Sequence, residues 1–416
     1  MAGDHIVRHG RSAWGATAAL IAVVALAGCG GHSGSGGNSG SSDPSQSAAA
    51  NLKPLDVVWV KPHRRLSATG QITVKFAGVL SPQSPLPTLS PYVPGQWTRQ
   101  GSTAIFTPDR AYPPDTNLAV TYAKKPGGAV KTIATPATPS GSLLRAEQIL
   151  AHLRYLPLTT TAPAASTAEQ EADDVYTPPA GSFSWRYPDT PSTIKQGWSP
   201  GKYGIVVRGA VIAFQHQAGL PLDGTIGPHT WHALIKADLA GTYDADRYSF
   251  VSADLYLPQR LSVWVNGKTV LTSPVNGGVA AAPTPLGTYP VYERFTSTTM
   301  SGTNPDGSKY KDPGVPWVNY FSGGSAVHGF PRASYGFPQS VGCLELPIPT
   351  AAQVFKLIDY GTLVNVAGPA TAPPPVASPG PPASPSPHPT TSPSSKPSSK
   401  PSKSPSAQPS HSKPGH

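Results

Sequence analysis

Two short motifs between residues 327 and 347 decide the fold of the C-terminal part of the chain. The first is Val327-His328-Gly329-Phe330, and the second is Ser340-Val341-Gly342-Cys343-Leu344-Glu345-Leu346-Pro347. Apolar residues of strand type flank both motifs, and a loop that contains proline and glycine separates them. We therefore expect two β-segments, joined by this loop, that bring the two motifs face to face.

The residue types in these motifs suit nucleophilic catalysis. Cysteine attacks as its thiolate, and a histidine is the natural base to generate it; His328 precedes Cys343 by fifteen residues (343 − 328 = 15). Gly342 lets the backbone approach closely, and the N–H groups near it suit an oxyanion hole. Ser340 is expected to hydrogen-bond the histidine or the reaction intermediate. The alternatives are a buried inert thiol, a core histidine and a turn serine.

The flanking segments predict a β-rich framework over residues 248–366. Asn266-Gly267 lies between two alternating apolar runs and predicts a hairpin. Residues 284–291 read as a turn and strand, and residues 361–366 read as a closing strand. A short helix is expected over 350–358.

The pattern His-Gly, spacer, Ser-x-Gly-Cys resembles the L,D-transpeptidase (YkuD-like) catalytic domain, and Thr284-Pro285-Leu286-Gly287 matches the same family. The resemblance implies that His328 is the base and general acid and that Cys343 is the nucleophile. Ser340 and Gly342 frame the site. The other nitrogen of the histidine is usually held by a backbone carbonyl in this family, and no metal or other cofactor is implied.

The candidate substrate-binding residues are Tyr320, Gly329, Val341 and Glu345. The family often has His or Lys where this chain has Val341, and Arg or Asn where it has Glu345. These departures bear on substrate details and not on the nucleophile. Tyr320 has a core-strand role as its alternative. Arg332 lies in the loop between the motifs, where contact with substrate is one reading and a solvated position is the default.

The resemblance implies acyl transfer on the stem peptides of peptidoglycan. Cys343 would form a thioester with a tetrapeptide stem, and an amine of a second stem would resolve it as a 3→3 cross-link. Carbapenems would acylate Cys343. Three rivals stay open: an L,D-carboxypeptidase on the same stems, a ligase that attaches a different amine, and a catalytically silent wall-binding scaffold.

The N-terminus predicts an exported lipoprotein. A basic start is followed by the short apolar run 16–27, and Leu26-Ala27-Gly28-Cys29 resembles a lipobox, so residues 1–29 read as a signal peptide with Cys29 as the lipidation site. Lipidation would anchor the chain to the outer face of the cytoplasmic membrane, in the cell-wall space. The alternative is an ordinary signal or membrane segment with a chance cysteine. With Cys29 lipidated, Cys343 would be a free thiol.

Composition limits the partners. The chain has 416 residues and a formal net charge of +10, but no basic stripe interleaves with aromatics, so nucleic acid is not expected. Attraction to an anionic envelope and simple solubility both account for the charge. The Gly/Ser-rich residues 30–52 predict a flexible linker, and the Pro/Ser/Lys-rich residues 370–416 predict a disordered tail.

The remaining regions complete a mainly β, multidomain chain whose last part is the catalytic domain over 245–367. Short alternating strands predict a β-sandwich over 53–140, and its Phe106-Thr107-Pro108 run resembles bacterial immunoglobulin-like domains. Over 141–240, a helix followed by a turn is expected at 142–158, with Tyr155-Leu156-Pro157 ending the helix, and further helices are expected at 207–217 and from Thr230.

The helical region resembles a peptidoglycan-binding domain. The residues that carry the resemblance are Phe214-Gln215, Asp223-Gly224 and the Gly227–Leu234 run. An insert at 159–205 separates the first helix from the second, and it would build a lid or docking surface, or compromise the sugar-peptide groove. A packing module that binds nothing is the alternative.

Overall fold

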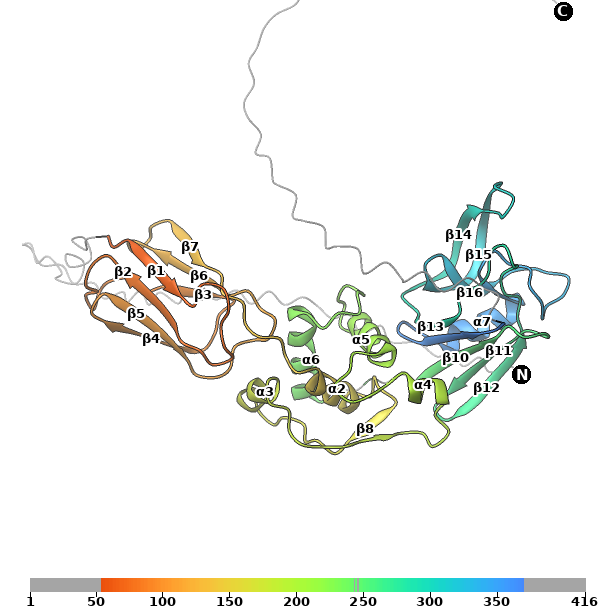
Figure 1. Cartoon of the computed structure of the whole chain (residues 1–416), viewed down its shortest axis with the longest axis horizontal. Helices are drawn as coiled ribbons and strands as arrows, with labels where there is room; N and C mark the ends of the chain where they lie inside the picture. The colour runs from red at the N-terminus through yellow and green to blue at the C-terminus, as the bar shows by residue number, and fades with distance from the viewer. Residues whose placement is uncertain (1–53, 243, 245–246, 370–416) are drawn as a thin grey trace, which may run out of the picture. The chain divides into compact units, whose positions relative to one another are not determined.

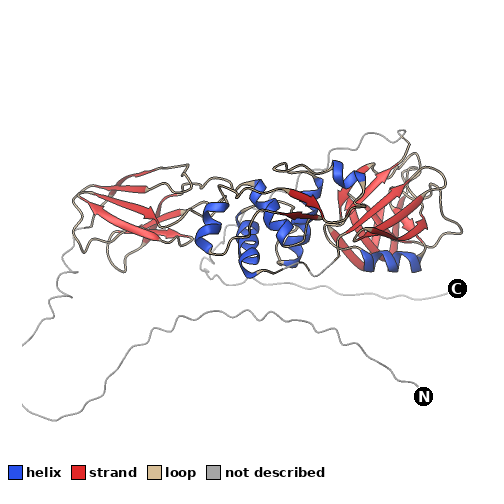
Figure 2. Ribbon diagram, turned by 90° about the horizontal axis from the view of Figure 1, so that it is seen from below, coloured by secondary structure: helices blue, strands red, loops and turns tan. Residues whose placement is uncertain are grey.

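The computed structural model describes residues 54–242, 244 and 247–369 (Figure 1). The predicted signal peptide with Cys29, the linker and the C-terminal tail lie outside these residues. Figure 2 shows that strands dominate the two ends of the described chain and that most helices lie in the segment between them in sequence. None of the described helices is long and apolar enough to cross a membrane.

The first region contains two antiparallel sheets that share one buried apolar core. One sheet has the order β1-β2-β5-β4 and the other β3-β6-β7. Alternation places Ile72, Val74 and Val120 in the core, because successive side chains of a strand point to opposite faces. The predicted β-sandwich is confirmed as a two-sheet architecture, and its kinship to immunoglobulin-like domains stays a prediction. The strands are β1 (Val57–Lys61), β2 (Ile72–Phe76), β3 (Thr88–Ser90), β4 (Gly95–Gln100), β5 (Thr103–Pro108), β6 (Ala119–Ala123) and β7 (Val130–Ala134).

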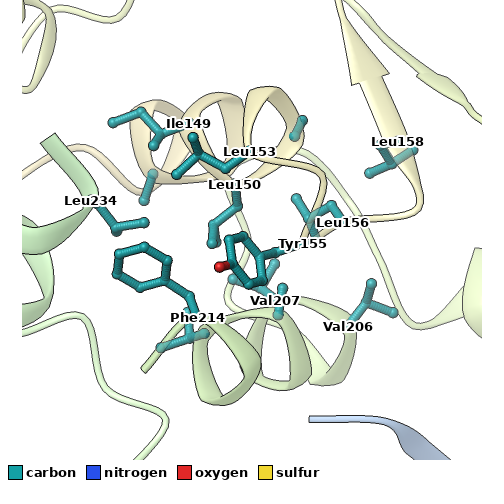
Figure 3. Packing of buried hydrophobic residues seen from close by; sticks show 14 of the residues in the cluster. Ile149, Leu150, Leu153, Tyr155, Leu156, Leu158, Val206, Val207, Phe214 and Leu234 are labelled. Atoms are coloured by element: carbon teal, nitrogen blue, oxygen red, sulfur yellow. The ribbon is translucent and has the colours of Figure 1, made fainter. Parts of the chain in front are cut away.

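Three longer helices form the middle region: α2 (Leu143–His152), α5 (Ile205–Gln217) and α6 (Pro228–Ala240). Their apolar faces meet in the core drawn in Figure 3, where the rings of Tyr155 and Phe214 pack edge to face at 5.4 Å. The first helix ends at His152 and is followed by a turn, as expected for the segment 142–158. The third begins at Pro228, two residues before Thr230, since proline is tolerated in the first turn.

The insert packs into this helical core. It contributes α3 (Ala168–Asp174), α4 (Ser192–Gln196) and the strand β9 (Phe183–Trp185), which pairs with β8 (Leu158–Thr160). Val175 and Ile194 are fully buried against the helices. The insert is therefore a structural part of the helical region.

The last region begins with a five-stranded sheet in the order β12-β11-β10-β18-β13. The hairpin between β11 and β12 turns at Asn266 and Gly267, both with positive φ, and confirms the predicted hairpin. The closing strand is confirmed as β18, which pairs in parallel with β10. The strands are β10 (Ser249–Asp254), β11 (Arg260–Val265), β12 (Lys268–Pro274), β13 (Gly287–Pro290) and β18 (Leu363–Ala367).

A second sheet, in the order β14-β15-β16-β17, carries both sequence motifs. Its strands are β14 (Glu293–Thr303), β15 (Lys309–Ser322), β16 (Ser325–Gly329) and β17 (Leu344–Leu346). The expected short helix is α7 (Ile348–Leu357), which begins two residues before its predicted start. Val251, Phe321 and Val354 show that the two sheets and α7 share one apolar core.

Candidate active site

Parallel pairing of β16 with β17 brings the two motifs together. His328 lies opposite Glu345 in the register, and Cys343 directly precedes β17, two residues before Glu345. Paired residues of a sheet share a face, and so do residues two apart on a strand. The expectation that two β-segments bring the motifs face to face is confirmed.

His328 and Cys343 line one cavity of about 200 Å³. The long hairpin β14–β15 supplies several walls of this cavity, including Tyr310 and Asp312. The loop between the motifs supplies Phe330 and Arg332. The hairpin and the loop between the motifs therefore both contribute walls to the cavity that holds the sulfur. The other lining residues are Met300, Asn304, Val315, Val341 and Glu345.

His328 is held as a neutral base. Its Nδ1 lies 3.0 Å from the carbonyl oxygen of Gly329, which can only accept, so Nδ1 carries the proton and donates. Nε2 of the neutral ring then carries the lone pair that can accept a proton. Burial lowers the pKa of His328 below its usual value, and the bond to Gly329 opposes that shift. The carbonyl support expected from the family resemblance is present.

Cys343 rests as a thiol. The residue is half-buried, and its sulfur lies 3.9 Å from the carbonyl oxygen of Gly324. Burial raises the pKa of Cys343 to about 11. A hydrogen bond from the backbone of Ala326 favours the thiolate and opposes this rise. A raised thiol pKa beside a lowered imidazole pKa disfavours a preformed ion pair.

Ser340 and Thr284 hold the peptide of the nucleophile. The hydroxyl of buried Ser340 donates to the carbonyl oxygen of Cys343 at 2.7 Å, and the hydroxyl of Thr284 donates to the same oxygen at 3.3 Å. The Gly278 N–H in turn donates to the Thr284 oxygen at 2.9 Å. Ser340 thus contacts the backbone of the nucleophile and not the histidine, so it acts as a positioning residue.

Gly342 has the backbone conformation that the turn before β17 requires. Its φ is +102°, a region that favours glycine. Within the described part of the chain, the N–H groups of Gly342 and Cys343 make no hydrogen bond. Two such groups beside the sulfur suit the oxyanion hole expected from the sequence.

The four predicted substrate residues fall into different environments. Val341 lines the cavity and is partly exposed. Glu345 also lines it, but its carboxylate is bound by Arg332. Gly329 is buried and supplies the carbonyl that holds His328. Tyr320, on β15, is half-buried and stacks on Tyr292. It is not among the residues that line the cavity, but burial and the nearby Cys343 both raise its pKa, so it lies beside the site.

Two asparagines that the sequence did not single out support the site. Asn319 is fully buried on β15 and donates from Nδ2 to the carbonyl oxygen of Val327 at 3.3 Å. Asn276 is fully buried and accepts the Gly336 N–H at 2.9 Å. Neither asparagine lies in a recognisable sequence motif. Their role becomes visible only in the structure, where both side chains are fully buried and hydrogen-bonded.

Comparisons with known proteins agree with this geometry. Residues 247–366 match the family model of the L,D-transpeptidase catalytic domain, and residues 187–234 match that of a peptidoglycan binding domain. No curated protein sequence matches the chain.

Solved structures of L,D-transpeptidases are similar only at low TM-scores. One from Mycobacterium smegmatis is 14% identical, with 76% of this chain and 100% of that chain covered, at a TM-score of 0.27. The catalytic domain from E. faecium is 25% identical, with 30% of this chain and 100% of that chain covered, at a TM-score of 0.27. L,D-transpeptidase 3 from Mycobacterium tuberculosis, solved in complex with a faropenem-derived adduct, is 14% identical, with 74% of this chain and 97% of that chain covered, at a TM-score of 0.27. These values carry no structural argument here. The matched sequence range, with Cys343 and His328 in one cavity inside it, identifies residues 247–366 as an L,D-transpeptidase catalytic domain.

Proposed function

We propose that the chain cross-links peptidoglycan as an L,D-transpeptidase that uses Cys343 as its nucleophile. The observation that carries this proposal is the shared cavity of Cys343 and His328 within the range matched by the family model. A donor tetrapeptide stem enters this cavity with the carbonyl of its third residue, a diamino acid, at the sulfur.

In the first step, Nε2 of His328 takes the thiol proton as the sulfur attacks that carbonyl. The free N–H groups of Gly342 and Cys343 would stabilise the oxyanion of the tetrahedral intermediate. The C–N bond to the terminal D-alanine then breaks, and the imidazolium returns the proton to the leaving amine. A thioester on Cys343 remains.

In the second step, the side-chain amine of an acceptor stem attacks the thioester. His328 removes the proton from the attacking nitrogen and returns it to the departing sulfur, so the thiol and the neutral ring are regenerated. The products are a 3→3 cross-link and free D-alanine. No net redox change occurs, and the peptide bond formed replaces the one broken.

The direct test is the incubation of the purified full-length chain, in mild detergent, with disaccharide-tetrapeptide, followed by mass spectrometry. We expect a dimer that has lost one D-alanine, and we expect no dimer from the Cys343→Ala variant. Cys343→Ser is the matched variant, because it replaces the thiol by a hydroxyl of similar shape that is a far weaker nucleophile at neutral pH, and it should give no dimer either.

Each rival predicts a different result. Tripeptide alone would assign the chain as an L,D-carboxypeptidase, since water would then resolve the thioester. A conjugate to another amine in the mixture would assign a ligase. No turnover, together with a Cys343 that resists alkylation and forms no adduct with a carbapenem, would overturn the enzyme assignment in favour of a scaffold.

We propose that carbapenems acylate Cys343 and that the helical region binds peptidoglycan. The first proposal rests on the nucleophile assignment, and a mass increase confined to the Cys343 peptide would support it. The second rests on the match over residues 187–234. Co-sedimentation of the Cys343→Ala chain with purified sacculi should fall when the exposed face of α6 is altered, for example by His232→Ala.

We also propose that the chain is exported and anchored through lipid on Cys29, with the N-terminal sandwich as an immunoglobulin-like spacer. The support is the sequence of the first 29 residues, which lie outside the described part of the chain. Metabolic labelling with a fatty-acid probe should mark the wild-type chain at the cell envelope. A Cys29→Ala chain that retains the label would contradict the anchor.

A further inference from the structure

An ion pair inside the active-site cavity departs from what the sequence led us to expect. Arg332 donates from Nε to Oε2 of Glu345 and from Nη2 to Oε1, both at 2.8 Å. This is a bidentate fork, which fixes the plane of a guanidinium as well as its position. The Glu345 carboxylate is almost fully buried, whereas the Arg332 side chain is 30% exposed. Of the two charged groups, the Arg332 guanidinium is therefore accessible and the Glu345 carboxylate is not.

The loop that carries Arg332 is held in place from several sides. The backbone of Asn276 exchanges two hydrogen bonds with the backbone of Glu345, at 3.0 and 2.9 Å. The side chain of Asn276 binds the loop at the Ser334 carbonyl and the Gly336 N–H. The hydroxyl of Tyr335 accepts the Arg332 N–H at 3.2 Å. The guanidinium is thus preorganised before any ligand arrives.

Arg332 retains donors for a ligand. Its Nε bonds Glu345, and its Nη2 bonds both Glu345 and the Gln339 carbonyl oxygen at 3.3 Å. Among the described residues, nothing accepts from Nη1, which carries two protons. Arg332 lines the same cavity as Cys343 and His328.

The cavity offers one permanent positive charge. His328 is kept neutral because burial lowers its pKa. Two of the other described residues that line the cavity are acidic, namely Glu345, which pairs with Arg332, and Asp312 on β15; the rest are neutral. Among these residues Arg332 is therefore the only cationic donor for an anionic group that enters beside the sulfur, and Nη1 is the donor that remains for it.

We propose that Arg332 binds the α-carboxylate of the residue that leaves the donor stem, and that Glu345 positions Arg332 for this task. The proposal rests on the function proposed above and names the specificity residue of that site. The bond that Cys343 cleaves lies one residue before the end of a tetrapeptide, so the terminal carboxylate is separated from the scissile nitrogen by a single carbon. A fixed cation in the same small cavity selects stems with only one residue beyond that bond.

The test compares two donors with the full-length chain: a disaccharide-tetrapeptide with a free terminal carboxylate and the same molecule with a terminal carboxamide. The amide keeps the shape and removes the charge. Release of the terminal residue, D-alanine or D-alaninamide, is measured as kcat/KM. We expect the wild-type chain to prefer the carboxylate by roughly tenfold or more, as for other charge-assisted hydrogen bonds. This comparison needs no variant, so it does not depend on whether a variant folds.

Variants then assign the preference to Arg332. Arg332→Gln alone would leave buried Glu345 without a counter-charge, so the informative variant is the double change R332Q/E345Q, in which two amides replace the ion pair. We expect its preference for the carboxylate to vanish, chiefly through a higher KM for that donor. Arg332→Lys keeps a charge and should keep part of the preference. Arg260→Gln, on the exposed side of β11, is the matched control and should behave as wild type.

The outcomes separate the two proposals. A wild-type chain that releases both residues equally well, or a double variant that keeps the full preference, would overturn the role of Arg332 and leave cross-linking intact. A wild-type chain that releases neither would overturn the proposed function itself, and the role of Arg332 with it.

Discussion

The Nδ1 atom of His328 donates to the carbonyl oxygen of its own neighbour Gly329, across 3.0 Å. A backbone carbonyl cannot take up a proton, so this contact fixes the tautomer without adding a negative charge to the ring. Burial then lowers the pKa of the ring, and this effect outweighs the hydrogen bond to Gly329 and the charge of Glu345, which both raise it. The histidine is a ready base at neutral pH, although it is a poor partner for a resting thiolate.

We expect kcat/KM to depend on pH through His328 alone over the neutral range. The active ring is the neutral one, so activity is lost as pH falls through its folded pKa, which lies below the usual value of 6.5. The thiol, with a pKa of about 11, stays protonated through neutral and mildly alkaline pH. A pH–rate profile should show one acidic limb and then a plateau. A limb above pH 6.5, or a second ionisation near the pKa of an ordinary thiol, would contradict this picture.

Replacement of Ser340 by alanine should lower kcat and leave KM unchanged. The hydroxyl holds the Cys343 carbonyl at 2.7 Å, and its loss costs about 1 kcal/mol, or roughly fivefold in rate. Because Thr284 donates to the same oxygen, the double variant with Thr284→Ala should lose more than the sum of the two. Steady-state kinetics beside Ser262→Ala, on β11, would check this. Full activity in the double variant would exclude a positioning role.

Replacement of Gly342 by alanine should reduce both stability and activity. A Cβ there would meet Ser325 Oγ at 3.4 Å, an ordinary contact, so the cost comes from the φ of +102° and amounts to about 1–3 kcal/mol. Gly267→Ala is the matched control, because Gly267 has a φ of +95° and lies in the hairpin turn. Both variants should lower the melting temperature. Only Gly342→Ala should lower kcat, and equal kinetics in the two would remove Gly342 from the site.

Replacement of Arg145 by methionine should destabilise the helical region. Arg145 is fully buried and pairs with Glu171 from the insert and with Asp238 from α6, where Nη2 lies 3.2 Å from the carboxylate. Without it, two buried carboxylates lose their counter-charge, at a cost of about 3–5 kcal/mol. Calorimetry should show a lower unfolding temperature than for wild type or for Lys236→Met, an exposed change on α6. An unchanged transition would show that the insert is not tied to the core through this residue.

The local pattern of the sequence was enough to predict most elements and the reacting pair. Alternation and the Asn266-Gly267 turn predicted the hairpin, because these signals act within a few residues. The spacing of His328 and Cys343 predicted two strands that meet, and the parallel register of β16 and β17 bears this out. Such features depend on neighbours in the chain, which a sequence displays directly.

The hydrogen-bond and ion-pair partners of these residues were decided by the tertiary structure. Glu345 was expected to contact substrate, and the structure gives its carboxylate to Arg332, thirteen residues away in the loop. Thr284 reaches the Cys343 carbonyl across 59 residues of sequence. Glu171 lies in an insert expected to form a lid or surface, and it is buried against Arg145.

The sequence by itself thus determined the candidate pair of this protein, a histidine on one short strand and a cysteine directly before the next, with Gly342 in the turn between them. The tertiary structure alone decided which groups hold that pair and which charge faces the substrate. The physical reason is that a buried hydrogen bond or ion pair depends on the register and distance of segments far apart in the chain, and no local periodicity records that distance.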